Sequence, residues 1–439
     1  MDQSDMYLKH HTKHSKSMVA VFPLHATNAD SQPINNACCG DSLHQESSRM
    51  QLMQICLVLT TLFVLTHCNA MEPLSAFATG NWQFTARLYN EILKDKPNQN
   101  FIFSPFSIEA ILALIAAGAK NDTLLEFASA LNLPPQETTE EALRNVFILL
   151  KQKSMHFQLS SANKLFVNND FHILDSFKKR AIENYDADIE NIDFAKRVEA
   201  AQKINRWVEE RTNHKIRDIV NPYDIDNSIS LFLINALHFK GTWKNVFSYI
   251  NKETFYITKT NTKEVDMMYK KKEFRYYESP TLKAKFLELP YSKTDITMTI
   301  VLPDEIEGLA ALEKDIYPLL KPQNLEYEHV SVTLPSFLVE SEYDLKSILK
   351  RLGLKKAFSY SADLSGISSE PLKVSAVIQK AFINVTKFGT EAAAVTSVRV
   401  PVKGRIWSTP AKRFLADHPF IYYLKFQDVL LFSGRISKF

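Results

Sequence analysis

The stretch that decides the fold of this 439-residue chain is Gly389–Thr396, which reads GTEAAAVT. Along it and the residues that follow, side chains alternate between two faces. Because neighbouring side chains of a strand point to opposite faces, such a segment can enter a sheet with its small face buried and its charges in water. A flexible surface loop is the simpler interpretation, but such a loop needs no alternation. One face holds Thr390, Ala392, Ala394, Thr396, Val398 and Val400, and the other holds Glu391, Ala393, Val395, Ser397 and Arg399 with both charges.

The sequence on either side predicts an α+β domain with an extensive sheet. Ser104-Pro105 is typical of a helix N-cap followed by proline at the first helical position. The segment Phe106–Ala119 is apolar nearly all round, which indicates a buried helix. Leu231–Phe239 is almost continuously apolar, as expected of a central strand covered on both faces. Near the end of the chain, Phe420–Leu424 and Val429–Phe432 favour a hairpin.

The length suits one large domain or two or three ordinary ones, and the composition is ordinary for a globular protein. Apolar residues make up 45% of the chain and charged residues 23%, and a formal charge of +3 gives no case for a nucleic-acid partner. No Gly/Ser/Pro-rich linker and no internal repeat interrupts Met71–Phe439, which we expect to be a single domain. All the cysteines precede it, so this domain has no disulfide, thiol nucleophile or thiolate metal site. They are Cys38, Cys39, Cys56 and Cys68.

The sequence of the N-terminal region is typical of a segment that is removed by cleavage and not of a folded part of the domain. The apolar run Ile55–Thr66, followed by the small residue Ala70, matches the hydrophobic region and cleavage site of a secretory signal. The run is shorter than the ~20 residues that a membrane span needs, although an uncleaved anchor is the alternative. We expect residues 50–70 to be a signal peptide, with synthesis beginning at Met50 or Met53 and residues 1–49 a non-native or alternative-start leader. The mature protein is then secreted and extracellular, without a membrane attachment.

No catalytic motif is present in the sequence. It contains no G-x-S-x-G elbow, P-loop, G-x-G-x-x-G or H-E-x-x-H. Asp417-His418 has no nucleophile in evident register, and we expect it to form a surface turn before Pro419. The sequence therefore predicts a protein that is not an enzyme and that needs neither a cofactor nor a metal.

Ordered blocks across Met71–Phe439 resemble the serpin family of protease inhibitors. Gly389–Thr396 is similar to the hinge of inhibitory serpins. Any one block would be weak evidence, whereas many in order with compatible spacing are strong. The further blocks are Asn100–Ile108, Ile204–Val208, Asn235–Trp243, Val265–Met268, Leu287–Tyr291, Tyr343–Leu345, Asp363–Ile367 and His418–Phe420.

The resemblance implies the serpin fold and a suicide-substrate mechanism. The fold is a single domain with a dominant mixed β-sheet, about nine helices and an exposed reactive-centre loop. A protease attacks this loop and forms an acyl-enzyme, and the cleaved loop then inserts into the main sheet as a new strand. Serpins usually place the scissile residue fourteen positions after the hinge glycine, which gives Lys403-Gly404 here, with Arg405-Ile406 as the alternative. A basic residue suits the pocket of a trypsin-like serine protease, the implied covalent partner of a monomeric inhibitor.

The resemblance also implies a polar cluster beneath the opening of the sheet, formed by Ser104, Ser107, Asn235 and Gln379. Gln379 replaces a histidine of the family. Because glutamine does not titrate, we expect this opening to lack the pH dependence of histidine.

Two further features concern the surface of the domain. Lys387 and Ser336 replace the partners of an ion pair that the family often has, which predicts a slightly looser top of the sheet. Asn121-Asp122-Thr123 is a sequon and a plausible glycosylation site.

Two other functions remain open. One is a non-inhibitory serpin that serves as a carrier, storage protein or chaperone. Such members tend to have bulky or charged hinge residues, and Thr390–Thr396 argues against this possibility. The other is cross-class inhibition of a cysteine protease, which Lys403 does not exclude.

Overall fold

The computed structural model describes residues 73–151, 156–390 and 410–439 of the chain. Nine α-helices lie within these ranges, and the first spans residues 73–95. The others are α2 (Pro105–Ala117), α3 (Asn121–Leu131), α4 (Gln136–Leu150), α5 (Asp175–Tyr185), α6 (Arg197–Arg211), α7 (Leu309–Leu312), α8 (Tyr317–Leu320) and α9 (Lys346–Arg351). Short 3-10 helices are η1 (Pro222–Asp224), η2 (Glu313–Asp315) and η3 (Lys356–Phe358).

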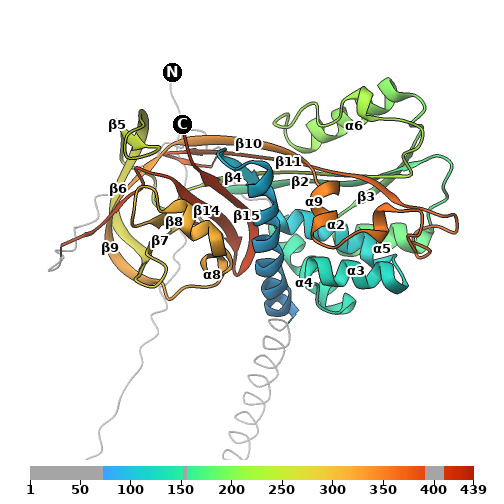
Figure 1. Cartoon of the computed structure of the whole chain (residues 1–439), viewed down its shortest axis with the longest axis horizontal. Coiled ribbons are helices and arrows are strands. Elements are labelled where there is room, and N and C mark those ends of the chain that lie inside the picture. Colours follow the sequence, from blue (N-terminus) through green and yellow to red (C-terminus); the bar gives the residue numbers. More distant parts are fainter. Residues whose placement is uncertain (1–72, 152–155, 391–409) are drawn as a thin grey trace, which may run out of the picture. The chain divides into compact units, whose positions relative to one another are not determined.

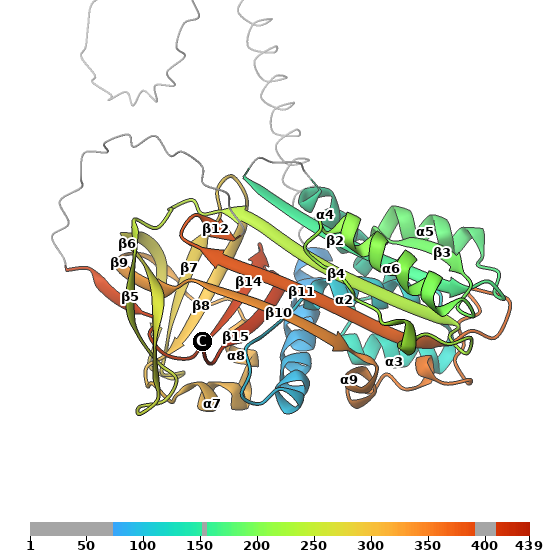
Figure 2. The same cartoon turned by 90° about the horizontal axis from the view of Figure 1, so that it is seen from above.

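A six-stranded mixed sheet dominates one part of the domain. Its order is β10 (Phe337–Asp344), β11 (Val374–Thr386), β12 (Gly389–Thr390), β4 (Leu231–Thr242), β2 (Phe157–Asn168) and β3 (Asp188–Ile192). The short β12 is antiparallel to both of its neighbours, and beyond it β11 and β4 pair directly and in parallel. Figure 2 shows β4, β11 and β10 as long neighbouring strands, with β12 at one end. We call that end the upper end of the sheet, and the line along which β4 and β11 pair the seam.

A nine-stranded sheet contains the remaining strands. Its order is β1 (Phe101–Phe103), β15 (Val429–Ile436), β14 (Phe420–Phe426), β8 (Ile296–Pro303), β7 (Ala284–Pro290), β6 (Thr262–Ser279), β9 (Glu326–Pro335) and β13 (Lys412–Leu415), with β5 (Tyr249–Tyr256) paired to β6.

Helices cover both faces of the six-stranded sheet. In Figure 1, α6 lies on one side of it, and α2 and α3 lie on the other. The side chains of β4 alternate accordingly: Leu231, Leu233 and Leu237 belong to the main core, whereas Phe232 and Ile234 pack in a smaller cluster with α6. None of the helices in the described ranges is long and apolar enough to span a membrane.

The structure confirms the expected α+β class with a large mixed sheet and several of the expected elements. The helix α2 begins at Pro105, the first helical position that the sequence predicts, and ends at Ala117, two residues before the expected end. Ser104 caps it by accepting a hydrogen bond from the Ser107 amide. Almost all of its residues are buried, as its apolar sequence predicts. The strand expected at Leu231–Phe239 is β4, and the terminal hairpin is β14 and β15.

Candidate functional site

The upper end of the seam is occupied by Gly389 and Thr390. Thr390 pairs with Val385 of β11 and with Gly241 of β4, and Gly389 pairs with Thr386 and Thr242. These two residues therefore hold the position of an additional strand between β11 and β4. The rest of the predicted hinge, Glu391–Thr396, and the predicted scissile residues lie outside the described residues. The latter are Lys403, Gly404, Arg405 and Ile406.

Gly389 is the residue that allows this close approach. Its φ of +151° lies in a region that side chains with a Cβ rarely adopt. A Cβ on Gly389 would lie 1.9 Å from the Gly241 carbonyl oxygen, so no other residue fits without moving β4.

An aromatic group holds Thr390 in place. Thr390 is fully buried, and its Oγ1 lies 2.5 Å from the Tyr291 hydroxyl oxygen. The Tyr291 ring stacks on Trp243 at 4.3 Å between centroids and meets Phe239 edge-on at 4.8 Å. Burial raises the pKa of Tyr291, so the phenol stays neutral. We call Phe239, Trp243 and Tyr291 the aromatic group. These three residues lie within the Asn235–Trp243 and Leu287–Tyr291 blocks of the family resemblance, but the sequence did not identify them as site residues.

Trp243 connects the aromatic group to the turn between β11 and β12 through two hydrogen bonds. Its indole Nε1 donates a hydrogen bond to the Thr386 carbonyl at 2.9 Å, and its amide donates to the Phe388 carbonyl at 3.0 Å. The turn between β11 and β12 is therefore fixed to the end of β4.

Further along the seam, the four predicted polar residues lie together and are buried. Gln379 of β11 and Asn235 of β4 are directly paired, and the Gln379 Nε2 donates to the Asn235 Oδ1 at 2.6 Å. The same amide group exchanges 3.0 Å hydrogen bonds with the backbone of Ser104. The Asn235 Nδ2 donates to the Ser107 carbonyl at 3.1 Å and also contacts the Ser107 hydroxyl. These contacts join both strands of the seam to the start of α2.

Asn163 is a fifth member that the sequence reasoning missed. It lies on β2 opposite Asn235, and its Oδ1 accepts hydrogen bonds from Asn235 at 2.6 Å and Ser107 at 3.1 Å. Its Nδ2 is buried without a hydrogen-bond partner among the described residues. The only signal in the sequence is a polar residue within an otherwise strand-like segment. We call these five residues, Ser104, Ser107, Asn163, Asn235 and Gln379, the polar cluster.

Lys387 and Ser336, the residues of the predicted missing ion pair, make other contacts. The Lys387 Nζ lies 4.8 Å from the centroid of the Phe388 ring, a cation–π geometry. The Ser336 amide donates to the Asp266 carbonyl at 2.8 Å. The looser top of the sheet stays a prediction.

The predicted glycosylation residue Asn121 begins α3 and is exposed. Its Nδ2 donates to the Asp363 carboxylate at 2.7 Å, and the Thr123 hydroxyl of the same sequon is buried and accepts from the Asp363 amide. A glycan on Asn121 would replace the first of these contacts, and its presence stays a prediction.

The prediction of a surface turn at Asp417-His418 is wrong for the histidine. His418 is 6% exposed. Its Nδ1 lies 2.7 Å from Asp417 Oδ1, and its Nε2 lies 2.9 Å from the Pro303 carbonyl. The imidazole joins the start of β14 to the end of β8. A local sequence pattern could not reveal a partner so far away along the chain.

Comparisons with known proteins agree with this architecture. A family profile described as serpin (serine protease inhibitor) matches residues 79–439. Antichymotrypsin-2 of Bombyx mori is 34% identical over 81% of this chain and 96% of its own length. Leukocyte elastase inhibitor of Sus scrofa is 36% identical over 84% of this chain and all of its own.

A solved structure supports the same conclusion. The crystal structure of Serpin48, described as a highly specific serpin in the insect Tenebrio molitor, superposes with a TM-score of 0.77 at 39% identity. It covers 83% of this chain and 98% of that one. With a family match across most of the sequence, the chain belongs to the serpin family of serine protease inhibitors.

Proposed function

We propose that this protein is a secreted suicide-substrate inhibitor of trypsin-like serine proteases. The protease serine attacks the carbonyl carbon of Lys403, the Lys403-Gly404 bond breaks, and Gly404 leaves with a free amine. The inhibitor is then an ester on the serine hydroxyl oxygen. Before water can hydrolyse that ester, the loop enters the seam as a strand and displaces the protease. The serpin itself is not an enzyme in this scheme and needs no cofactor or metal.

The observation that carries the proposal is the position of Gly389 and Thr390 between β11 and β4. They are antiparallel to both strands, so a strand that continued from Thr390 would separate them along the whole seam. Ile383 and Phe239 face the core from the two strands of the seam and are large, and Ala392, which would pair with both of them, is small. The alternation of the loop therefore fits the space that an added strand would have.

If the loop continued the pairing register of β12 along the seam, one particular loop residue would reach the polar cluster. Thr390 pairs with Val385 and Gly241, so six residues later Thr396 would pair with Gln379 and Asn235. Insertion would break the Gln379–Asn235 hydrogen bond at this level, and the Thr396 hydroxyl could bond to either group. A hydroxyl is suited to this position because a buried polar group without a partner costs ~1–3 kcal/mol.

Of the two alternatives, only the non-inhibitory serpin fits these observations less well. A non-inhibitory serpin does not need its loop to enter the seam, so the small residues that alternate from Thr390 to Thr396 argue against it. Inhibition of a cysteine protease uses the same loop and remains compatible with Lys403. Secretion rests on the apolar run Ile55–Thr66, and we infer a monomer that binds neither nucleic acid nor membrane in its mature form.

Incubation of residues 71–439 with trypsin, followed by denaturing electrophoresis and mass spectrometry, tests the proposal. We expect an SDS-stable adduct of both proteins and a released C-terminal fragment that begins at Gly404. A fragment that begins at Ile406 would move the scissile bond to Arg405. Cleavage without an adduct, for trypsin and for a panel of serine and cysteine proteases, would contradict inhibition.

A further inference from the structure

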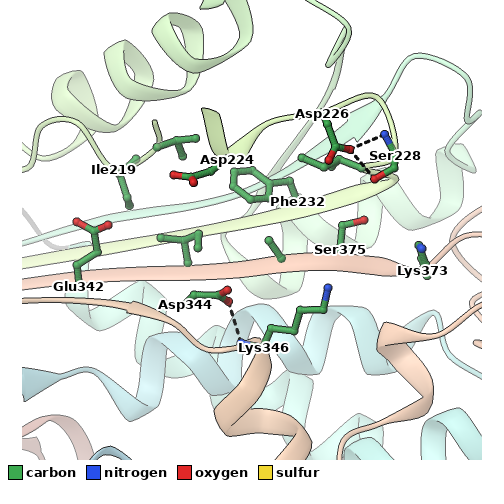
Figure 3. Close-up of a pocket in the computed structure, with 14 residues that line it drawn as sticks. Ile219, Asp224, Asp226, Ser228, Phe232, Glu342, Asp344, Lys346, Lys373 and Ser375 are labelled. Carbon is green, nitrogen blue, oxygen red and sulfur yellow. Dashed lines mark hydrogen bonds between the residues drawn. The ribbon is translucent and has the colours of Figure 1, made fainter. Parts of the chain in front are cut away.

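A pocket of about 500 Å³ lies across the lower part of the seam, on the α6 side of the sheet. One wall comes from β4 and the connection between α6 and β4, and the other comes from β10, β11 and the start of α9 (Figure 3). Any strand that entered the seam at this level would therefore lie between the two walls. The polar and charged residues that line the pocket are Asp224, Asp226, Ser228, Glu342, Asp344, Lys346, Lys373 and Ser375.

The residues that line the pocket favour binding of a side chain that has an apolar stem and a cationic end. Phe232, Ala376 and Ile378 form an apolar floor, and Ala376 and Ile378 are only half-buried. Four carboxylates outnumber two ammonium groups. One of these ammonium groups, on Lys373, lies 3.6 Å from the centroid of the Tyr360 ring and already has a partner. An arginine side chain has the required form, because its methylene groups can cover apolar surface while its guanidinium binds carboxylates.

The register of β12 brings one particular arginine to this pocket. Nine residues after Thr390, an uninterrupted strand would pair Arg399 with Ala376 of β11 and Phe232 of β4, which are both in the floor. Paired residues of antiparallel strands point to the same face, so the Arg399 side chain would point to the α6 side.

The other charge of the same loop face supports this register. Glu391 would pair with Lys240 of β4, whose side chain is exposed on that face. Glu391 and Arg399, the two charges of this face, would thus each meet groups of opposite sign.

We propose that the pocket is the receptor for the Arg399 guanidinium once the loop has been cleaved and inserted. The proposal rests on the proposed function, because it needs the loop to enter the seam. The contact exists only in the inserted form, so it favours that form over the uncleaved one. Asp224 and Asp344 are the carboxylates chosen to test it, since they come from opposite walls.

The test compares the denaturant midpoint of unfolding before and after the loop is cut. A lysine-specific endoproteinase cuts after Lys403 and leaves Arg399 in the inserted segment, and the cleaved protein is separated from any adduct. The variants are Arg399→Ala, the pocket double variant Asp224→Asn/Asp344→Asn, and their combination. Asp218→Asn is the matched control, an exposed carboxylate on the same connection that does not line the pocket.

We expect cleavage to raise the midpoint of the wild-type protein strongly. In the cleaved form, Arg399→Ala and the pocket double variant should each lower the midpoint, and their combination should lower it no further than one alone. In the uncleaved form the two changes should not be coupled, and the control should match the wild type in both forms. Strong stabilisation on cleavage with purely additive effects would overturn the Arg399 contact and leave insertion intact. No stabilisation on cleavage in any variant would overturn insertion, and the proposed function with it.

Discussion

The hydroxyl oxygens of Thr390 and Tyr291 lie 2.5 Å apart, in a buried contact between the start of the loop and the residue that follows β7. The hydrogen bond fixes the first two residues of the loop in the sheet. Because Thr390 starts in register with Val385 and Gly241, a loop that enters the seam as we propose would continue a strand that has already begun.

Tyr291→Phe should remove this hydrogen bond while it keeps the stacking on Trp243. We expect the free energy of unfolding of the uncleaved protein to fall by about 1 kcal/mol, because the buried Thr390 hydroxyl loses a partner. Urea denaturation measures the change. Tyr249→Phe is the control, since that side chain is 45% exposed, and a Tyr291→Phe midpoint equal to that of the control would contradict the role of the bond.

Gly389→Ala should push the start of the loop out of the seam. The added Cβ would clash with the Gly241 carbonyl, and the backbone conformation would also be strained. Gly353→Ala separates the two effects, because Gly353 also has a positive φ but has open space around its Cβ position. We expect Gly389→Ala to lower the thermal midpoint clearly more than Gly353→Ala. Equal losses would mean that the close approach to β4 is unimportant.

Gln379→His should add a pH dependence to the free energy of unfolding that the glutamine of this chain cannot supply. Burial among neutral polar groups holds the pKa of such a histidine below its ordinary value of ~6.5. The folded state then favours the neutral histidine, and the stability that this histidine contributes is fully present above pH ~6.5. It is lost as the pH falls toward the lowered pKa, because the unfolded chain binds the proton more readily than the folded one. Chemical denaturation between pH 8 and pH 5 measures the difference from wild type. Parallel curves for the two proteins would refute this reasoning.

Glu109→Gln should stabilise the protein at neutral pH. Glu109 is fully buried on α2, where its Oε2 accepts a 2.5 Å hydrogen bond from Asn81, and its Oε1 has no hydrogen-bond partner within the described ranges. Burial raises the pKa of this carboxyl well above the ordinary value. The folded protein therefore loses stability as the pH rises from the ordinary glutamate pKa toward the raised one.

The Glu109→Gln variant should escape this loss, so its advantage over the wild type should grow between pH 4.5 and pH 8, by up to ~1.4 kcal/mol per pH unit. Denaturation curves across that range measure it. Glu199→Gln, on a side chain that is 75% exposed, is the control and should show no such trend. A constant difference across the range would be inconsistent with a protonated Glu109.

The sequence predicted the helices and strands whose apolar residues alone are enough to identify them. The helix α2 and the strand β4 are apolar on nearly every side, and both are buried as that pattern requires. The hairpin of β14 and β15 likewise follows from two apolar runs around a short polar turn.

The site could be predicted only in part, because its contacts join residues that are distant in the sequence. Thr390 and Tyr291 are 99 residues apart, and nothing local to either indicates the other. Asn163 was missed because its role depends on pairing with Asn235 across two strands. The polar cluster was found through the family resemblance, and the buried His418 was misjudged because its partner at Pro303 lies on a different strand.

The most direct test of loop insertion measures the width of the six-stranded sheet before and after the loop is cut. The domain has no cysteine after Cys68, so spin labels can be placed at Asp188→Cys on β3 and Glu342→Cys on β10, which lie on opposite sides of the seam. Pulsed electron paramagnetic resonance gives the distance in each state. Insertion of the loop predicts an increase of about 4.8 Å, the spacing of one added strand, after cleavage at Lys403. An unchanged distance in fully cleaved protein would contradict it.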